Sequence, residues 1–223
     1  MVKYVMVINL RLYKLIKLNG YTKSEMNALN EKKLITVNGK ILNITSIINE
    51  DDIILVDNKR ILTPKFHYFL YYKPKGIEST ISDKKESYIK NINIDFKVMV
   101  AGRLDKESFG LMILSNDGDF INTIQTSFEY KKTYIVEFEK EINDSFLSGF
   151  DKEYIIRGRK TSKIYYEVIN KNTLKLILNE GVYHEIRHIT KLNGNRVTNL
   201  KRIKIGKYEL GDMKEGEIKE VER

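Results

Sequence analysis

Residues 100–120, V-A-G-R-L-D-K-E-S-F-G-L-M-I-L-S-N-D-G-D-F, hold one carboxylate in a confined backbone setting. Gly102 and Gly110 bound a short loop that carries Asp105, and the apolar run 111–114 predicts a buried strand directly after it. A loop supported by a rigid strand commonly displays reactive side chains. Asp105 is therefore a candidate nucleophile, the alternative being a strand connection whose charges are simply solvated.

A second pattern, H-E-I-R-H at residues 184–188, has the H-E-x-x-H spacing of zinc proteases. There, two histidines one helical turn apart bind the metal and the glutamate activates water. His67 is the only other histidine, no H-x-x-G-x-x-H continuation follows, and Arg187 would lie within one turn of the ion. A third ligand would have to be a glutamate farther along: Glu209, Glu215 or Glu217. The sequence favours coincidence, and we expect no metal site.

The composition favours a protein that binds a polyanion. Lysine and arginine total 39 against 30 aspartates and glutamates, a formal charge of +9, although such an excess could also serve solubility alone. The absence of cysteine excludes disulfides, thiolate catalysis and cysteine-ligated metal clusters. No stretch has the length of a membrane span, and the N-terminus shows no secretory pattern, so we expect a cytoplasmic protein.

Residues 1–62 are expected to form a small α+β domain. Residues 9–19 place apolar and basic side chains in the pattern of an amphipathic helix. Residues 22–29 predict a second helix, for which Thr22 or Ser24 can serve as the N-terminal cap.

Two β-branched stretches follow, residues 34–43 and 51–57. Asn38-Gly39 predicts a hairpin within the first stretch, because this dipeptide suits the tight turns that join paired strands. Pro64 marks the expected linker to a second domain.

That second domain, residues 65–223, is expected to consist mostly of strands. Lys73-Pro74-Lys75-Gly76 reads as a strand-ending turn with two solvated lysines, and Asp119 is the expected cap of a helix. Strands are predicted over residues 67–72, 111–114, 132–138, 163–169 and 173–178, and residues 154–159 lead into the strand at 163–169. Helices are predicted over 120–126 and 142–150, within the loop 81–97, and from the H-E-I-R-H segment to Asn193-Gly194.

The longer strings resemble motifs of the pseudouridine synthases of the RsuA/RluB type. These strings are G-R-L-D, S-x-G-L and N-D-G in the central segment, K-x-Y at 132–134, G-x-Y-H-E-I-R at 181–187 and L-x-R-x-x-I-G at 200–206, which matches the family's closing strand. The resemblance implies that Asp105 is the nucleophile, that Tyr134 lies against the target uracil with a proton-transfer role, and that Arg187 pairs with Asp105. It also implies that no cofactor is needed.

Several positions depart from that pattern. Glu185 and His188 stand where the family has glutamine and arginine, and Tyr72 stands where asparagine is common. The order helix, helix, hairpin near the N-terminus resembles the S4 RNA-binding domain, although Tyr13 replaces its usual aspartate. The implied RNA-binding residues are Arg11, Lys14, Lys17, Lys23, Lys32, Lys33 and Lys40. The implied fold is α+β, an S4-like domain followed by a mixed, mainly antiparallel sheet with flanking helices.

The expected activity is conversion of uridine to pseudouridine in ribosomal RNA, after the base has been flipped out of its stack. Arg103 is a candidate wedge or phosphate contact. The small size leans toward members that modify small-subunit 16S RNA, and the alternatives are a 23S RNA enzyme or a non-catalytic RNA-binding or ribosome-assembly protein. The expected partner is ribosomal RNA or a subunit assembly intermediate, with no membrane contact and a monomeric chain.

Overall fold

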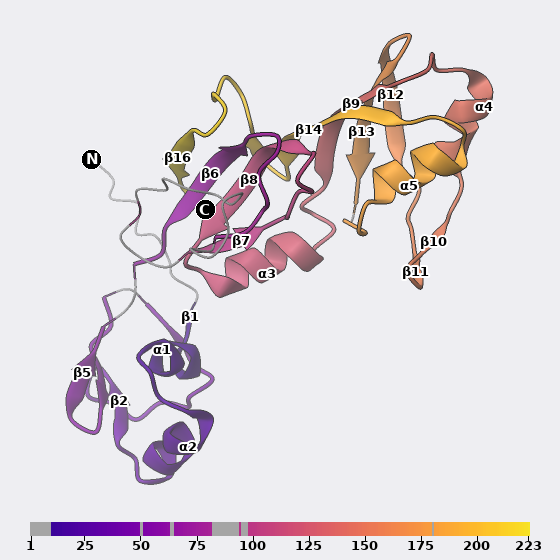
Figure 1. The fold of residues 1–223 in the computed structure, drawn as a ribbon. Coiled ribbons are helices and arrows are strands. Elements are labelled where there is room, and N and C mark those ends of the chain that lie inside the picture. Colours follow the sequence, from indigo (N-terminus) through magenta and orange to yellow (C-terminus); the bar gives the residue numbers. More distant parts are fainter. Residues whose placement is uncertain (1–9, 50, 63–64, 82–93, 95–97, 180) are drawn as a thin grey trace. The chain divides into compact units, whose positions relative to one another are not determined.

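The computed structural model of the protein describes residues 10–49, 51–62, 65–81, 94, 98–179 and 181–223. The chain divides into two compact units, Met1–Lys65 and Phe66–Arg223 (Figure 1). Pro64 and most of the loop predicted over 81–97 lie outside the described residues. Of the helices in the described ranges, none combines the length and apolarity needed to cross a bilayer.

The first described element of the first unit is a short strand rather than a helix. Leu10–Arg11 forms β1 and pairs with β3 (Ile47–Ile48), so α1 is confined to Leu12–Leu18. The predicted helix is therefore present, but it starts at Leu12 and not at residue 9. Its buried side chains share one face, as an amphipathic helix requires: Leu12, Leu15 and Ile16.

The second helix, α2 (Lys23–Glu31), begins with a reciprocal cap. The backbone N–H of Glu25 donates to the Thr22 hydroxyl at 3.3 Å, and the Glu25 carboxylate accepts from the backbone N–H of Thr22 at 2.7 Å. Both bonds satisfy groups that the helix terminus leaves without a partner. Of the two caps that the sequence allows, Thr22 is the one used.

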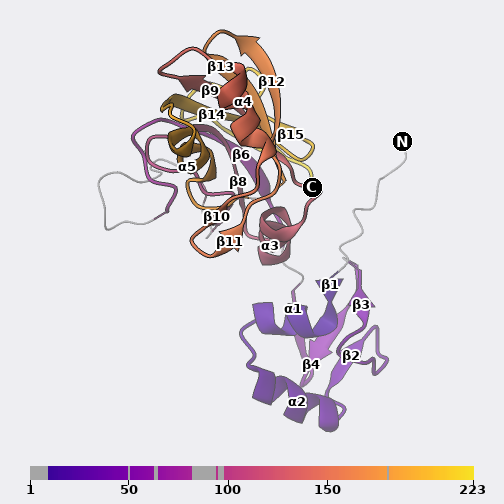
Figure 2. The ribbon, with the colours of Figure 1, turned by 90° about the vertical axis from the view of Figure 1, so that its right-hand side faces the viewer.

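The turn predicted at Asn38-Gly39 is present, but the hairpin of two strands predicted around it is wrong. Val37 and Lys40 exchange backbone hydrogen bonds around that turn, but residues 41–46 form no strand. Instead, β2 (Ile35–Val37) pairs with β4 (Ile54–Val56) (Figure 2), and β4 pairs with β5 (Lys59–Ile61). The valine and isoleucine side chains of β2 and β4 are buried, so long-range burial prevails over the local turn signal.

In the described part of the second unit, nine strands form one sheet. Their order is β12-β13-β9-β14-β8-β6-β16, with β7 beside β8 and β15 beside β14 (Figure 1). Among the described strand pairs, only β14 and β8 run parallel. The expected mixed, mainly antiparallel sheet is confirmed.

The bounds of these strands follow the predictions closely at β9 and β13. The nine strands are β6 (Tyr68–Lys73), β7 (Met99–Ala101), β8 (Phe109–Ser115), β9 (Lys132–Phe138), β12 (Tyr165–Asn170), β13 (Thr173–Leu178), β14 (Val197–Ile205), β15 (Tyr208–Glu209) and β16 (Ile218–Val221).

Two smaller pieces complete the unit. The helix predicted over 142–150 is shorter than expected: α4 (Asp144–Leu147) runs directly into a 3-10 turn, Ser148–Asp151. A separate two-stranded hairpin follows, formed by β10 (Ile155–Ile156) and β11 (Arg159–Lys160).

Alternate side chains of β6 enter two separate cores, one on each side of the sheet. Phe69 and Tyr71 join the core that α5 (Glu185–Leu192) covers. Tyr68 and Leu70 join the core that α3 (Gly118–Thr126) covers. This is the period-two alternation of a strand that is buried on both sides. We call the two sides the α5 face and the α3 face.

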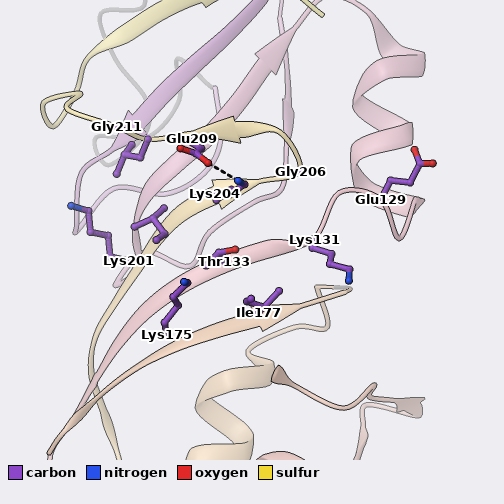
Figure 3. Close-up of a pocket in the computed structure, with 12 residues that line it drawn as sticks. Glu129, Lys131, Thr133, Lys175, Ile177, Lys201, Lys204, Gly206, Glu209 and Gly211 are labelled. Carbon is purple, nitrogen blue, oxygen red and sulfur yellow. Dashed lines mark hydrogen bonds and ion pairs between the residues drawn. The ribbon is translucent and has the colours of Figure 1, made fainter. Parts of the chain in front are cut away.

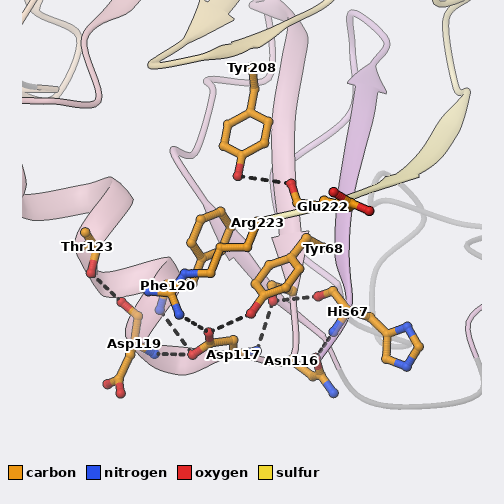
Figure 4. A network of polar contacts seen from close by, with 11 residues as sticks. His67, Tyr68, Asn116, Asp117, Asp119, Phe120, Thr123, Tyr208, Glu222 and Arg223 are labelled. Carbon is orange, nitrogen blue, oxygen red and sulfur yellow. Dashed lines mark hydrogen bonds and ion pairs between the residues drawn. The ribbon is translucent and has the colours of Figure 1, made fainter. Parts of the chain in front are cut away.

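An acidic turn fixes the start of α3 (Figure 4). Asp117 caps the helix, not Asp119 as predicted: its carboxylate accepts from the backbone N–H groups of Asp119 (3.0 Å) and Phe120 (3.2 Å). The same carboxylate accepts from the Tyr68 hydroxyl at 3.1 Å and lies 3.4 Å from the Arg223 guanidinium. Burial and the Asp117 charge raise the pKa of Tyr68. The N-D-G turn thereby fastens α3 to β6 and to the end of the chain.

Candidate active site

The loop between β7 and β8 carries Asp105, and its backbone is held from several sides. Ser79 Oγ donates to the Leu104 carbonyl at 2.6 Å and accepts from the Leu104 N–H at 2.8 Å. The Ser108 N–H donates to the Asp105 carbonyl at 3.0 Å, and the Gly76 N–H donates to the Lys106 carbonyl at 2.8 Å. The turn after β6 therefore fixes the loop on both sides of Asp105.

Lys73 is fully buried, so the expectation that it is solvated is wrong. Its ammonium donates to the carbonyls of Pro74 (2.9 Å) and Ile77 (2.6 Å) and lies 3.5 Å from that of Lys106. Burial lowers the pKa of Lys73 to about 8, while the nearby Asp105 charge acts in the opposite direction. Lys73 thus ties the turn to the Asp105 loop and places a cation close to the carboxylate.

Asp105 itself meets two side chains from the segment around α5. His184 Nε2 lies 2.9 Å from Asp105 Oδ1, and Arg187 Nε lies 3.7 Å from Oδ2. Arg187 also donates from Nη2 to Ser108 Oγ at 3.2 Å. The carboxyl side chain is 28% exposed, so it remains open to an incoming group. The structure thus brings Asp105 and Arg187 together, and it adds His184, to which the sequence assigned no role.

The start of α5 explains why Arg187 points to the loop. Ile186 and Ile189 are buried in the core of the α5 face, which leaves Arg187 on the helix side toward Ser108. Glu185 is also buried, and its carboxylate accepts from the backbone N–H of Val182 at 3.1 Å. Glu185, which stands where the family has glutamine, therefore accepts a backbone hydrogen bond at the start of α5.

The H-E-x-x-H spacing does not produce a zinc-protease arrangement. His184 contacts Asp105, the His184 and His188 ring centres are 6.4 Å apart, and the Glu185 carboxylate is engaged by Val182. Within the described ranges, three metal-ligating side chains of the histidine, cysteine or acidic type do not come together.

Arg202, the arginine of the L-x-R-x-x-I-G string, is a site residue to which the sequence assigned no role. It is 2% exposed, and it donates from Nε to the Leu111 carbonyl at 2.7 Å and from Nη2 to the Gly102 carbonyl. Its Nη1 donates to the Tyr134 hydroxyl at 3.4 Å. A cation two residues after the buried Leu200 of the same strand was the available signal, because residues two apart share a face. Arg202 joins the Asp105 loop to the predicted base platform, Tyr134.

Gly110 allows the close approach that this arrangement needs. A Cβ at this position would lie 2.2 Å from the Arg202 carbonyl oxygen, and its φ is +106°. Side chains other than hydrogen are excluded by both facts.

The remaining predicted contacts are on the surface. Arg103 is exposed, and in the first unit six of the seven predicted RNA-binding residues are exposed, with Lys14 half-buried. Arg11 donates to the Thr45 carbonyl at 3.0 Å.

A basic pocket of about 670 Å³ lies on the opposite, α3 face (Figure 3). It is lined by Lys131, Thr133, Lys175, Lys201 and Lys204, among others, and none of the side chains around Asp105 contributes to it. Lys204 pairs with Glu209, which also lines the pocket, and Lys175 pairs with a glutamate of β12.

Residues 67–191 match the family described as RNA pseudouridylate synthase. An uncharacterized RNA pseudouridine synthase of Aquifex aeolicus is 30% identical over 181 residues, covering 78% of this chain and 76% of that protein. The ribosomal small subunit pseudouridine synthase A of Pasteurella multocida is 28% identical over 212 residues, or 91% of each. The dual-specificity RNA pseudouridine synthase RluF of Salmonella typhi is 31% identical over 67% of this chain and 52% of its own length.

A solved structure described as a pseudouridylate synthase agrees in fold. It superposes with a TM-score of 0.66 at 26% identity and covers 96% of each chain. The matched family segment holds the Asp105 loop, β9 and the part of α5 that carries Arg187. The chain therefore belongs to the RNA pseudouridine synthase family.

Proposed function

We propose that this synthase isomerises a specific uridine of ribosomal RNA, in the small subunit, with Asp105 as the nucleophile. The observation that carries the proposal is the Asp105 carboxylate, partly open to solvent and held between His184 and Arg187. The small-subunit assignment is supported by the relative that matches over 91% of both chains and is named for that subunit.

The reaction breaks the N1–C1′ bond of uridine and forms a C5–C1′ bond. The proton leaves C5, N1 gains one, and no electrons are exchanged with a cofactor. An ionised carboxylate can attack the sugar or the base, or it can stabilise positive charge while a ribose proton is removed. The Arg187 guanidinium pairs with the ionised form in each of these routes.

A stacked uridine cannot reach this carboxylate, so the base has to be flipped out of the RNA. In the proposal the flipped uracil lies against Tyr134, whose hydroxyl is already oriented by Arg202 and which can act in proton transfer. Arg103, exposed and two residues from Asp105, serves as the wedge or phosphate contact. The basic residues of the first unit, which we take to be S4-like, bind the surrounding RNA.

A pseudouridine map of ribosomal RNA tests the proposal directly. Cells that lack the protein are rescued with the wild type or with Asp105→Asn. Loss of one small-subunit site that only the wild type restores is the expected result. A lost site in the large-subunit RNA would overturn the small-subunit assignment, and no lost site would overturn ribosomal RNA as the substrate.

The division of labour between the units has its own test. Residues 1–62 are deleted, folding is checked by circular dichroism, and single-turnover rates are measured against RNA concentration. An unchanged plateau rate with a higher half-saturation concentration is expected. A collapsed plateau in a folded protein would show that the first unit takes part in more than RNA binding.

A further inference from the structure

The side chain of Tyr183 lies in a three-layer stack beside Asp105. The rings of Tyr183 and His184 are 3.8 Å apart between centres and nearly parallel, at 13°. The Arg157 guanidinium carbon also lies 3.8 Å from the centre of the Tyr183 ring. Two groups at this distance from one ring cannot share a face without a clash, so Arg157 and His184 cover opposite faces. Tyr183 is half exposed, but both of its faces are occupied.

Two members of the stack have an unfavourable backbone. Within the described part of Phe66–Arg223, Arg157 (φ 51°) and His184 (φ 54°) are the only residues other than glycine at positive φ. This region costs energy for any residue with a Cβ, and such residues persist where the surroundings impose them. Arg157 occupies the tip of the β10–β11 hairpin, and His184 directly precedes α5.

The stack ends on the candidate nucleophile. His184 Nε2 lies 2.9 Å from Asp105 Oδ1, within hydrogen-bond distance, whereas Arg187 Nε is 3.7 Å from Oδ2. The contact with His184 fixes the rotation of the Asp105 carboxylate about its Cβ–Cγ bond. One oxygen is held by the imidazole, and the other faces Arg187.

We infer that His184 is a positioning residue for Asp105, held in place by its stack with Tyr183 and Arg157. The inference rests on the proposed role of Asp105. When Nε2 carries a proton, the imidazole donates to Oδ1 and orients the carboxylate before RNA arrives. Small displacements of a reacting group can cost about a hundredfold in rate, so this one hydrogen bond is expected to affect the chemical step.

Two substitutions of His184 separate the hydrogen bond from the stack. His184→Phe keeps a ring on Tyr183 but removes the donor, and His184→Gln offers an amide donor without the ring. Single-turnover rates are measured with unmodified transcripts of both ribosomal RNAs, and melting temperatures are recorded for each variant. We expect His184→Phe to lower the plateau rate about tenfold to a hundredfold with half-saturation unchanged. His184→Gln should recover part of that loss.

The hairpin tip offers a second, independent arm with a matched control. Arg157→Ala removes the cation that covers Tyr183, and Arg159→Ala removes the same charge from the same exposed hairpin. We expect Arg157→Ala to lower the plateau rate several-fold and Arg159→Ala to leave it unchanged. Equal rises in half-saturation with unchanged plateau rates in both variants would make Arg157 a simple RNA contact and overturn its role in the stack. This arm also carries the test if His184→Phe does not fold.

Asp105→Asn in the same assay distinguishes the two levels of the argument. A fully active, folded His184→Phe beside an inactive Asp105→Asn overturns the role of His184 alone. A fully active Asp105→Asn overturns the proposed nucleophile, and the role of His184 with it.

Discussion

The nine-stranded sheet carries two kinds of positive charge, buried around the Asp105 loop on the α5 face and exposed at the pocket on the α3 face. On the α5 face, Lys73 and Arg202 are fully buried and donate to backbone carbonyls in and around the Asp105 loop. On the α3 face, Lys175 and Lys204 are partly exposed and pair with glutamates whose side chains are more than 60% exposed. The cations around the Asp105 loop fix a backbone, and Lys175 and Lys204 are displayed to solvent. Lys132, which is buried and donates to the Ile124 carbonyl of α3 at 3.2 Å, behaves like the first group.

The difference between buried and exposed cations shows where a charged side chain determines the backbone geometry. A buried cation is tolerated when its donors are all engaged, and the bonds it makes are then strong because little water competes. An exposed ion pair is screened and contributes little. Substitutions of the buried cations should therefore change rate or stability strongly, and those of the exposed lysines at the pocket should not.

The largest effect is expected from Asp105→Asn, which keeps the shape of the side chain and removes its charge. We expect the single-turnover rate to fall by a factor on the order of a thousand or more, because the proposed nucleophile is lost. The matched control is Asp212→Asn, an exposed aspartate of the same unit, which should keep the wild-type rate. A rate for Asp105→Asn within tenfold of wild type would contradict the comparison.

Gly110→Ala should be the most destabilising small change. The new methyl group would meet the Arg202 carbonyl at 2.2 Å, and the φ of +106° disfavours any Cβ, so a loss of about 3 kcal/mol or more is expected. Gly216→Ala is the control, because its φ is also positive (+82°) but its Cβ would meet open space. Urea unfolding measures both variants, and equal losses would show that backbone strain, not the close approach, decides.

Lys73→Met should lower the free energy of unfolding by about 2 kcal/mol, because buried carbonyls lose their donor. The looser Asp105 loop should also lower the single-turnover rate. Lys75→Met is the control: Lys75 is exposed, and its ammonium donates to the Asn199 side chain. Lys75→Met is expected to stay within about 0.5 kcal/mol of wild type.

The lowered pKa of Lys73 adds a pH dependence with a definite sign. Between its folded value of about 8 and an unfolded value of about 10.4, the unfolded chain binds a proton that the folded chain does not. Raising the pH through this window therefore favours the folded state. The stability of the wild type relative to Lys73→Met should increase from pH 8 to pH 10, by at most about 1.4 kcal/mol per pH unit. A difference that is flat or that falls would show that Lys73 is not desolvated.

Local patterns predicted much of this fold. The apolar side chains over 132–138 and 173–178 predicted β9 and β13 with the correct bounds. The reason is that the alternation of buried and exposed side chains along a strand can be read from neighbouring residues alone. The glycine-bounded loop and the apolar run after it placed Asp105 correctly before β8. The pairing of β2 with β4 was missed because it depends on which distant strand completes the core.

The contacts within the site were harder to predict from the sequence, because the residues that make them are far apart along the chain. Lys73 looks like a solvated lysine because its partners are backbone carbonyls, which every residue has. His184 and Asp105 are far apart in sequence, and nothing in the H-E-x-x-H spacing indicates that the histidine meets a carboxylate instead of a metal. Arg202 carried a usable signal, a charge at an inward position of a strand, but its contacts with Gly102 and Tyr134 exist only in the folded sheet.

The smallest effect is expected on the α3 face, from Lys204→Ala. Lys204 pairs with Glu209, and the two side chains are 41% and 64% exposed, so the pair should contribute less than about 1 kcal/mol to the free energy of unfolding. The single-turnover rate should match wild type, since the pocket shares no side chain with the Asp105 site. Thermal unfolding at low and high salt checks the first point, because any small loss should disappear as salt screens the pair. A large loss that persists in salt would mean that Lys204, like the buried cations, holds the backbone, and the contrast between the buried and the exposed cations would fail.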